Sequence, residues 1–286
     1  MERPASDANR LGAASKTGAA AEHPRSSLAP DSESRWPIPA ALPKLAGDRI
    51  HVWCAGPDEL VSDQPCFAET LSAGERNRAE RFQFDRDRDR FIARHGLLRR
   101  ILGHYLSLDP AGISFIYESR GKPALPVAVG GQTLHFSLSH SDGLVLVAVS
   151  GRCALGVDVE RVRPIPESDQ IVAKWFSARE NAMLSALSAE QKLEAFFNGW
   201  TRKEAYLKAT GEGIADALPE IEVSLLPGGP ARLERIAGDE RAAALWSLHS
   251  LAPAAGYIGA LAVRAGDLKL NCWRWPKKFQ NAGFMR

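Results

Sequence analysis

The sequence predicts an α+β protein whose second half resembles its first. Apolar residues recur at three- and four-residue steps in two long segments, 75–106 and 193–211, which is typical of helices with one buried face. Short segments in which apolar and polar residues alternate lie between and after them, and these are predicted to be strands. The helix-start patterns of Leu71–Glu75 and Phe176–Glu180 are alike and lie ~105 residues apart, which predicts an internal repeat.

The composition is that of an ordinary soluble globular protein, with 286 residues of which 45% are apolar and 24% charged. A formal net charge of +2 gives no support to a generic role on nucleic acids or membrane surfaces. No apolar run approaches the ~18 residues of a membrane span. The four cysteines are scattered without a CxxC pair, which argues against zinc and favours reduced thiols in the cytoplasm.

Residues 1–46 are predicted to be a disordered N-terminal tail, because they are rich in Ala, Ser and Pro and show no periodic pattern. The tail lacks the apolar stretch of a secretory signal, and its acidic residues argue against a transit peptide. The first strand is predicted directly after it, at 49–53.

A capping box formed by Ser72 and Glu75 predicts the start of a helical region that runs to about Leu106, with a break near 84–87. The buried face of its second part consists of Phe91, Leu97, Leu98, Ile101, Leu102 and Tyr105. Between 75 and 100 the chain carries nine arginines against five acidic residues. Two interpretations stay open, a solvated charged face or a site for a small ligand with several phosphate groups.

The middle of the chain is predicted to consist of strands at 113–117, 134–139, 144–149 and 155–160. A turn at Arg120–Pro123 presents Lys122. The strand 134–139 ends in the segment Ser139-His140-Ser141-Asp142-Gly143, and a turn at 150–152 leads into the last strand.

The last of these strands places two carboxylates on one face. Leu155 and Val157 point to one side, whereas Asp158 and Glu160 point to the other. Carboxylates whose Cα atoms lie ~7 Å apart on one strand face repel each other unless water or a cation intervenes. The strand alone leaves two possibilities, a solvent-exposed pair or ligands of Mg2+.

The helix predicted at 193–211 has an apolar stripe made of Leu193, Phe196, Phe197 and Trp200. Four-residue steps extend this stripe to Glu204 and Lys208, and Gly211 ends the helix. A Glu-Lys pair at this spacing is usually a surface salt bridge. On a buried stripe, however, charges are costly unless polar groups meet them. Together with Asp158 and Glu160, the third carboxylate favours a metal site.

Closing strands are predicted at 221–225, 244–251 and 256–263. The residues after them, 266–286, form a basic and aromatic C-terminal extension to which the sequence assigns no role. It contains Trp273, Trp275, Lys277 and Lys278.

Four motifs, in order and spacing, resemble the 4'-phosphopantetheinyl transferase superfamily. They are Gly121-Lys122-Pro123, Ser139-His140-Ser141, Gly156-Val157-Asp158-Val159-Glu160, and Trp200-Thr201-Arg202-Lys203-Glu204-Ala205 followed by Lys208 and Gly211. The tryptophan before Lys-Glu-Ala is typical of the W-x-x-K-E-A subgroup of its Sfp-type enzymes. The resemblance covers roughly 49–263, and it departs from the pattern at Ser137, where many members have asparagine.

The resemblance implies an enzyme that transfers the 4'-phosphopantetheine arm of coenzyme A to a serine of an apo acyl or peptidyl carrier protein. The second product is adenosine 3',5'-bisphosphate. Mg2+ would be held by Asp158, Glu160 and Glu204. Glu204 would also take the proton of the serine, and Lys208 would stabilise the phosphates.

Contacts with the phosphates of coenzyme A are implied for Lys122, Ser139, His140, Lys208 and Arg90. Two further arginines, Arg86 and Arg94, compete with Arg90 for that place.

The implied fold has two similar subdomains, 47–153 and 154–265, related by a pseudo-twofold axis. Each is an antiparallel sheet packed with a long helix, the second carries the metal site, and coenzyme A lies in the cleft between them. Because both halves belong to one chain, a monomer is expected. Carrier proteins in such systems are acidic, so arginine-rich surface could steer them to the cleft.

Two other interpretations stay open. A different coenzyme A or nucleotide enzyme, such as an acyltransferase or a Mg2+-dependent phosphohydrolase, would leave no covalent change on a protein. A non-catalytic module that binds carrier proteins or coenzyme A would tolerate loss of the carboxylates, and the presence of all three argues against it.

Overall fold

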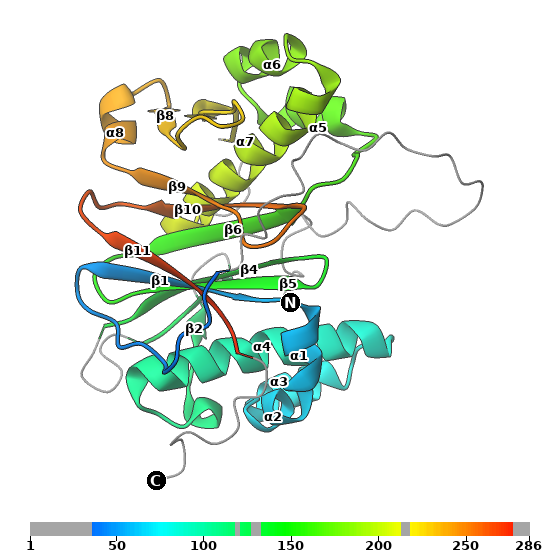
Figure 1. Ribbon diagram of the computed structural model, residues 1–286, viewed down its shortest axis with the longest axis vertical. Helices are drawn as coiled ribbons and strands as arrows, with labels where there is room; N and C mark the ends of the chain where they lie inside the picture. Colours follow the sequence, from blue (N-terminus) through cyan, green and yellow to red (C-terminus); the bar gives the residue numbers. More distant parts are fainter. Residues whose placement is uncertain (1–35, 118–120, 127–132, 213–217, 277–286) are drawn as a thin grey trace.

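A computed structural model describes residues 36–117, 121–126, 133–212 and 218–276. Within these residues the two larger sheets stack face to face, and one long helix covers the outer side of each (Figure 1). The helices are α4 (Asp85–Leu106) and α7 (Ala189–Thr210). The α+β class, with antiparallel sheets packed against long helices, is confirmed, while the pseudo-twofold axis stays a prediction.

The first sheet has the strand order β11-β1-β5-β4 and packs against α4. Its strands are β1 (Arg49–Ala55), β4 (His135–Ser141), β5 (Leu144–Ser150) and β11 (Lys269–Arg274). Pairing is antiparallel from β1 to β4, whereas β11 runs parallel to β1. The strands predicted at 49–53, 134–139 and 144–149 are confirmed, but β4 continues to Ser141. Ser137, Ser139 and Ser141 thus alternate along this strand with Leu138 and His140.

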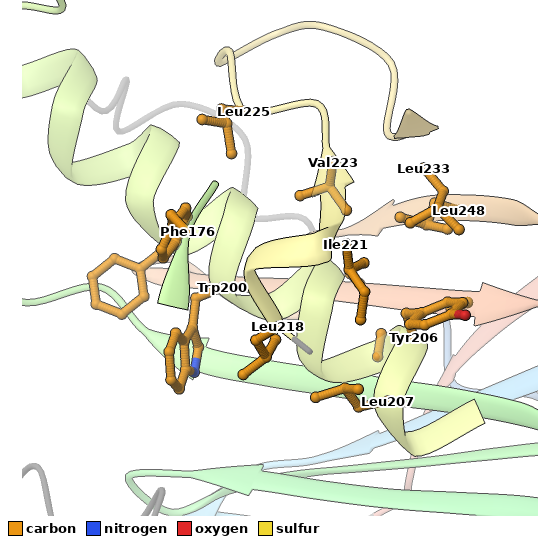
Figure 2. Close-up of a cluster of buried hydrophobic side chains, with 14 of the residues drawn as sticks. Phe176, Trp200, Tyr206, Leu207, Leu218, Ile221, Val223, Leu225, Leu233 and Leu248 are labelled. Carbon is orange, nitrogen blue, oxygen red and sulfur yellow. The ribbon is translucent and has the colours of Figure 1, made fainter. Parts of the chain in front are cut away.

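The second sheet has the order β6-β10-β9 and is antiparallel throughout. Its strands are β6 (Leu155–Arg161), β9 (Ser247–Leu251) and β10 (Tyr257–Val263). Helix α7 covers its outer side and shares a core with Phe176, Ile221 and Val223, as Figure 2 shows. Trp200 lies in this core and is 7% exposed, so the aromatic stripe predicted for the helix is buried.

A third core fills the space between the two sheets. Ile50 and Leu146 from the first sheet pack with Val157, Val159 and Leu261 from the second, and all five are fully buried. The predicted alternation along β6 therefore turns its apolar face toward the other sheet. Its other face is left for α7.

Shorter elements complete the described chain. They are α1 (Pro57–Ser62), α2 (Gln64–Glu69), α3 (Ala73–Ala79), a 3-10 turn (Pro110–Gly112), β2 (Ile116–Tyr117), β3 (Pro123–Ala124), α5 (Ser168–Trp175), α6 (Ala178–Ser185), a second 3-10 turn (Leu218–Glu220), β7 (Ile221–Val223), β8 (Leu233–Ile236) and α8 (Glu240–Ala244). The strand predicted at 244–251 begins only at Ser247, because the carboxylate of Asp239 caps α8 and keeps the chain helical to Ala244. The strand predicted at 113–117 is shorter in the structure, where β2 comprises Ile116 and Tyr117 alone.

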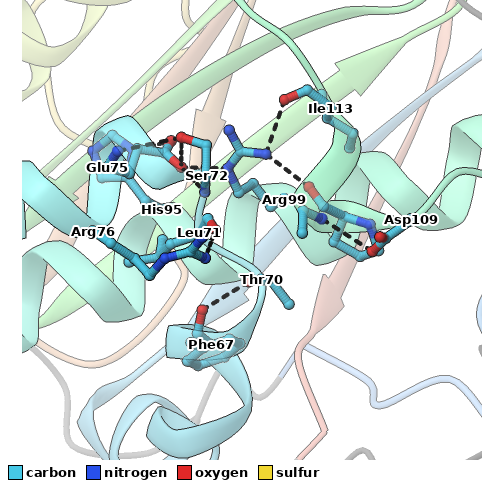
Figure 3. A network of polar contacts seen from close by, with 12 residues as sticks. Phe67, Thr70, Leu71, Ser72, Glu75, Arg76, His95, Arg99, Asp109 and Ile113 are labelled. Atoms are coloured by element: carbon cyan, nitrogen blue, oxygen red, sulfur yellow. Dashed lines mark hydrogen bonds and ion pairs between the residues drawn. The ribbon is translucent and has the colours of Figure 1, made fainter.

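The predicted capping boxes are both present, and the first belongs to a buried polar network (Figure 3). Glu75 accepts hydrogen bonds from the Ser72 backbone at 2.9 Å and from Arg99 Nε at 2.5 Å. Arg99 also donates to the carbonyls of Pro110 and Ile113. Burial raises the pKa of Glu75, but hydrogen bonds with His95, the Ser72 backbone and Arg99, together with the charge of Arg99, outweigh it and bring the pKa to about 2. The helical break predicted near 84–87 occurs just before Asp85, where α4 begins.

Both ends of the described chain pack on the first half of the protein. Trp36 is 8% exposed, and Leu42 and Leu45 lie against the core beneath α4, so the described part of the predicted tail has packing partners. Strand β11 ends at Arg274, and the next residue, Trp275, is 1% exposed and donates to Asp63 at 3.2 Å. Residues 1–35, Arg120, Lys277 and Lys278 lie outside the described residues. Among the helices described, none combines the length and the apolar content needed to cross a bilayer.

Candidate active site

The carboxylates of β6 lie where this strand meets α7. Asp158 is 4% exposed, and Glu160 is partly buried. Gly156, two residues before Asp158, lets the helix come close: a Cβ atom there would collide with the backbone of Ala205, Lys208 and Ala209. The sequence thus combines a strand carboxylate with a glycine that brings the helix to it.

Helix α7 contributes the other charged groups, Glu204 and Lys208, one turn apart. Glu204 is 7% exposed, and the side chain of Lys208 is 29% exposed. The Lys208 ammonium lies 2.7 Å from Asp158 Oδ1 and donates to Ser139 Oγ at 3.0 Å. Lys208 therefore joins the strand carboxylate to the edge of the first sheet.

Burial and mutual repulsion set the protonation of the two glutamates. Burial, followed by the negative charge of Asp158, raises the pKa of Glu160 and of Glu204 to about 7 each. Burial lowers the pKa of Lys208, but the carboxylates of Asp158 and Glu204 outweigh it, and the net direction is upward. The Lys208 ammonium thus stays charged among these carboxylates.

The chemistry of these groups fits a hard cation such as Mg2+, although their present arrangement does not enclose one. Within the described residues, no three His, Cys, Asp or Glu side chains surround a common point suited to a metal. Asp158 Oδ2 and Glu204 Oε1, however, are buried carboxylate oxygens without a hydrogen-bond partner there. Buried orphan carboxylate oxygens are the donors that Mg2+ prefers.

Cationic groups from the first half gather beside the carboxylates. Nη1 of Arg94 hydrogen-bonds Nε2 of His140 on β4. Burial, followed by the charges of Arg94 and Lys208, lowers the pKa of His140 to about 3. Lys122 Nζ donates to the carbonyl oxygen of Lys208 at the end of α7, 2.5 Å away. A concentration of positive charge of this kind suits a ligand with several phosphates.

Of the three competing arginines, Arg94 is the one in contact with His140. Arg90 is exposed, and its carbonyl accepts from Nε of Arg94 at 3.0 Å. Arg86 is 73% exposed and pairs with its neighbour Asp87. The assignment of Arg90 to a phosphate stays a prediction, and the contact with His140 favours Arg94, one of its two competitors.

Serine hydroxyls on β4 have a role that the sequence reasoning missed. Ser139 and Ser141 donate to Asp158 Oδ1 at 2.8 Å and to Glu160 Oε2 at 2.7 Å. The period-two recurrence of serine at 137, 139 and 141, opposite a strand with carboxylates at the same period, was the available signal. The Ser139 hydroxyl is thereby already engaged with a carboxylate.

Comparison with known families identifies both halves of the chain. Residues 154–262 match the family model described as 4'-phosphopantetheinyl transferase superfamily, and residues 60–152 match 4'-phosphopantetheinyl transferase, N-terminal.

Individual relatives point the same way. The 4'-phosphopantetheinyl transferase HetI of Nostoc sp. is 42% identical over 231 residues, which are 81% of this chain and 94% of HetI. The 4'-phosphopantetheinyl transferase psf-1 of Bacillus pumilus is 34% identical over 64% of this chain and 76% of its own. For Sfp of Bacillus subtilis the identity is 29%, over 59% and 72%. The chain therefore belongs to the 4'-phosphopantetheinyl transferase superfamily of enzymes, as its motifs predicted.

Proposed function

We propose that this protein transfers the 4'-phosphopantetheine moiety of coenzyme A to a serine of an apo acyl or peptidyl carrier protein, with release of adenosine 3',5'-bisphosphate and in dependence on Mg2+. The observation that carries the proposal is the cluster of Asp158, Glu204 and Lys208, buried where β6 meets α7 and flanked by cationic groups of the first half. Carboxylates for a metal beside cations for phosphates are what cleavage of a pyrophosphate requires.

In the proposed reaction the serine oxygen bonds to the phosphorus that carries the pantetheine arm. The bond from this phosphorus to the bridging pyrophosphate oxygen breaks, and its electron pair leaves with adenosine 3',5'-bisphosphate. Glu204, whose pKa burial and the charge of Asp158 raise above its usual range, takes the serine proton directly or through water. The Lys208 ammonium leaves Asp158 to stabilise charge on the leaving phosphate. Bound Mg2+, held by Asp158, Glu160 and Glu204, would neutralise charge on the pyrophosphate.

Cationic side chains and the neutral imidazole of His140 hold the substrate in this scheme. Lys122, His140 and Lys208, with Arg90 or Arg94, would contact the phosphates of coenzyme A, while Ser139 acts through Asp158. The protein would work as a cytoplasmic monomer, with subdomains 47–153 and 154–265 and the extension 266–286. Exposed arginines near the start of α4, Arg86 and Arg90, would help to steer an acidic carrier protein to the site.

The test is the intact mass of apo carrier proteins after incubation with the enzyme, coenzyme A and Mg2+, with and without EDTA. A mass gain of one phosphopantetheine that EDTA abolishes is the expected result. Glu204→Gln should abolish transfer while coenzyme A binding largely survives, and Asp158→Ala should remove both turnover and the response to Mg2+. Glu190→Gln, at the exposed start of the same helix, is the matched control and should be active.

Two results would redirect the proposal. Unmodified carriers together with measurable coenzyme A binding would favour a binding module. Formation of free phosphate or of a thioester product would favour a different enzyme of coenzyme A or nucleotides. A fully active Glu204→Gln variant would refute the base and metal role of this residue alone.

A further inference from the structure

The two large sheets meet along one seam without a backbone ladder. Strand β4 is an edge of the first sheet and β6 an edge of the second, and within the described residues no strand pairing joins them. The two strands are nevertheless in contact along their length. Edge strands leave backbone N–H groups unpaired, and a buried N–H needs an acceptor.

The acceptors are alternate serine hydroxyls of β4. Ser137 Oγ accepts from the Val157 N–H at 3.1 Å, Ser139 Oγ from Val159 at 3.3 Å, and Ser141 Oγ from Arg161 at 3.1 Å. The three serines are 4%, 4% and 6% exposed. Serine side chains at every second position therefore take the place of a β-ladder along this seam.

Two of these hydroxyls do more than join the sheets. A hydroxyl has one hydrogen and two lone pairs, so it can accept from a backbone N–H and donate elsewhere at once. Ser141 gives its hydrogen to Glu160 Oε2 and Ser139 gives its hydrogen to Asp158 Oδ1. The corresponding position for Ser137 is Gly156, which has no side chain and faces α7. Ser139 and Ser141 thus each have a carboxylate partner on β6, whereas Ser137 has none.

Ser141 is the clearer of the two carboxylate partners. Asp158 Oδ1 and Ser139 Oγ are both shared with the Lys208 ammonium, so removing the Ser139 hydroxyl would disturb several contacts. Ser141 makes one hydrogen bond to one carboxylate oxygen, at 2.7 Å. Hydrogen bonds of this length to an ionised acceptor are strong and fix its orientation.

We infer that Ser141 is a positioning residue, which holds the Glu160 carboxylate in the orientation needed to bind the metal ion. The inference rests on the proposed function, because that proposal makes Glu160 a metal ligand. A glutamate without such a partner samples several rotamers, and ordering it on metal binding opposes affinity. Groups that orient metal ligands typically change metal affinity by about 10–100-fold when removed.

The test compares Ser141→Ala with Ser137→Ala. Both variants delete a buried hydroxyl that accepts one backbone N–H at 3.1 Å, but only the first loses a carboxylate contact. Mn2+ affinity of the full chain without coenzyme A is measured by electron paramagnetic resonance, and the urea midpoint in EDTA is measured alongside. Both variants should lose similar stability, while Mn2+ should bind about 10-fold more weakly to Ser141→Ala alone. Ser141→Thr, which keeps the hydroxyl, should restore affinity.

Equal Mn2+ affinity of the two alanine variants would overturn the inference and reduce Ser141 to a link between the sheets. If Ser141→Ala does not fold, Ser141→Cys and Ser137→Cys give the same comparison, since a thiol is a weak donor of similar size. Wild-type protein that binds no Mn2+ would also overturn it, by removing Glu160 from the metal site. Failure of the proposed function has a separate signature, since wild-type protein would then leave carriers unmodified even though Mn2+ binds and the serine variants differ.

Discussion

Replacing Gly156 with alanine should lower both the stability and the activity of the protein, because the added methyl group would overlap the backbone of α7. It would collide with the carbonyl oxygen of Ala205 and the backbone nitrogen of Ala209, and it would lie 2.8 Å from the carbonyl carbon of Lys208. Ordinary contacts of a Cβ atom begin at 3.4 Å. Even the mildest of the three contacts, at 2.8 Å, thus requires α7 to withdraw from β6 by about 0.6 Å to reach 3.4 Å.

The expected destabilisation is at least about 3 kcal/mol. Overpacking of a core usually costs about 1–3 kcal/mol, since flexible side chains move aside. The atoms that meet the new methyl group at Gly156 are all backbone of a 22-residue helix, which cannot rotate away. For a chain of this size such a loss corresponds to a melting temperature lower by roughly 6–12 °C. Carrier modification should fall as well, because Lys208 moves away from Asp158.

Thermal unfolding, urea denaturation and intact-mass assays of the Gly156→Ala variant measure these effects. Gly74→Ala is the control, since a Cβ atom at Gly74 meets no atom within 4 Å and alanine suits the first turn of α3. It should leave stability unchanged or slightly raised. A Gly156→Ala variant with the wild-type melting temperature and urea midpoint would show that β6 and α7 are not packed as closely as described.

Three further predictions concern charged groups. Lys208→Met should lower the melting temperature in EDTA, since Asp158 loses its ammonium partner; added Mg2+ should then raise it more than in the wild type, and equal shifts would contradict the role of the ammonium as a counter-ion. Arg274→Ala should cost roughly 2–3 kcal/mol in urea denaturation, because the buried carboxylate of Glu59 loses its ion-pair partner and keeps the hydrogen bond from the Gly56 N–H; a change below 0.5 kcal/mol, the size of an ordinary surface effect, would show that the pair does not matter. Burial lowers the pKa of His51 from 6.5 to about 4, so between these pH values the unfolded chain binds one proton more than the folded chain. The free energy of unfolding should therefore fall by up to about 3 kcal/mol as pH drops from 6.5 to 4. In His51→Gln the dependence of this free energy on pH should decrease by the contribution of one proton, and an unchanged dependence would refute the prediction.

Local patterns in the sequence predicted most of the elements around the site. The capping boxes at Ser72 and Ser177, the stripe along α7 and the αL glycine Gly211 that ends it are all present. Each signal involves residues a few positions apart, where helix and strand geometry dictate which side chains share a face. The alternation in β6 likewise predicted which residues face the core between the sheets.

Apart from the serines of β4 and the carboxylates of β6, several contacts between distant segments left no comparable signal. Strand β11 pairs with β1 in the register Arg49 with Lys269, and nothing local in the C-terminal segment indicates that partner. The contact of Arg94 with His140 also joins separate elements, so three arginines at helical spacing were equivalent candidates from the sequence. The ammonium of Lys208 was assigned to phosphates, whereas its bond to Asp158 depends on how closely the helix approaches the strand.

The placement of the site explains why both halves of the chain must be held together firmly. Asp158 belongs to the second half, yet the hydroxyl that orients it comes from Ser139 in the first, and Lys122 of the first half caps the end of α7. A shift of one sheet against the other would therefore change the carboxylates and the cations at once. The chain restricts such a shift at two places, since β5 leads directly into β6, and β10 continues into β11, which is paired with β1. The C-terminal strand thus secures, at a distance, the geometry on which the proposed chemistry depends.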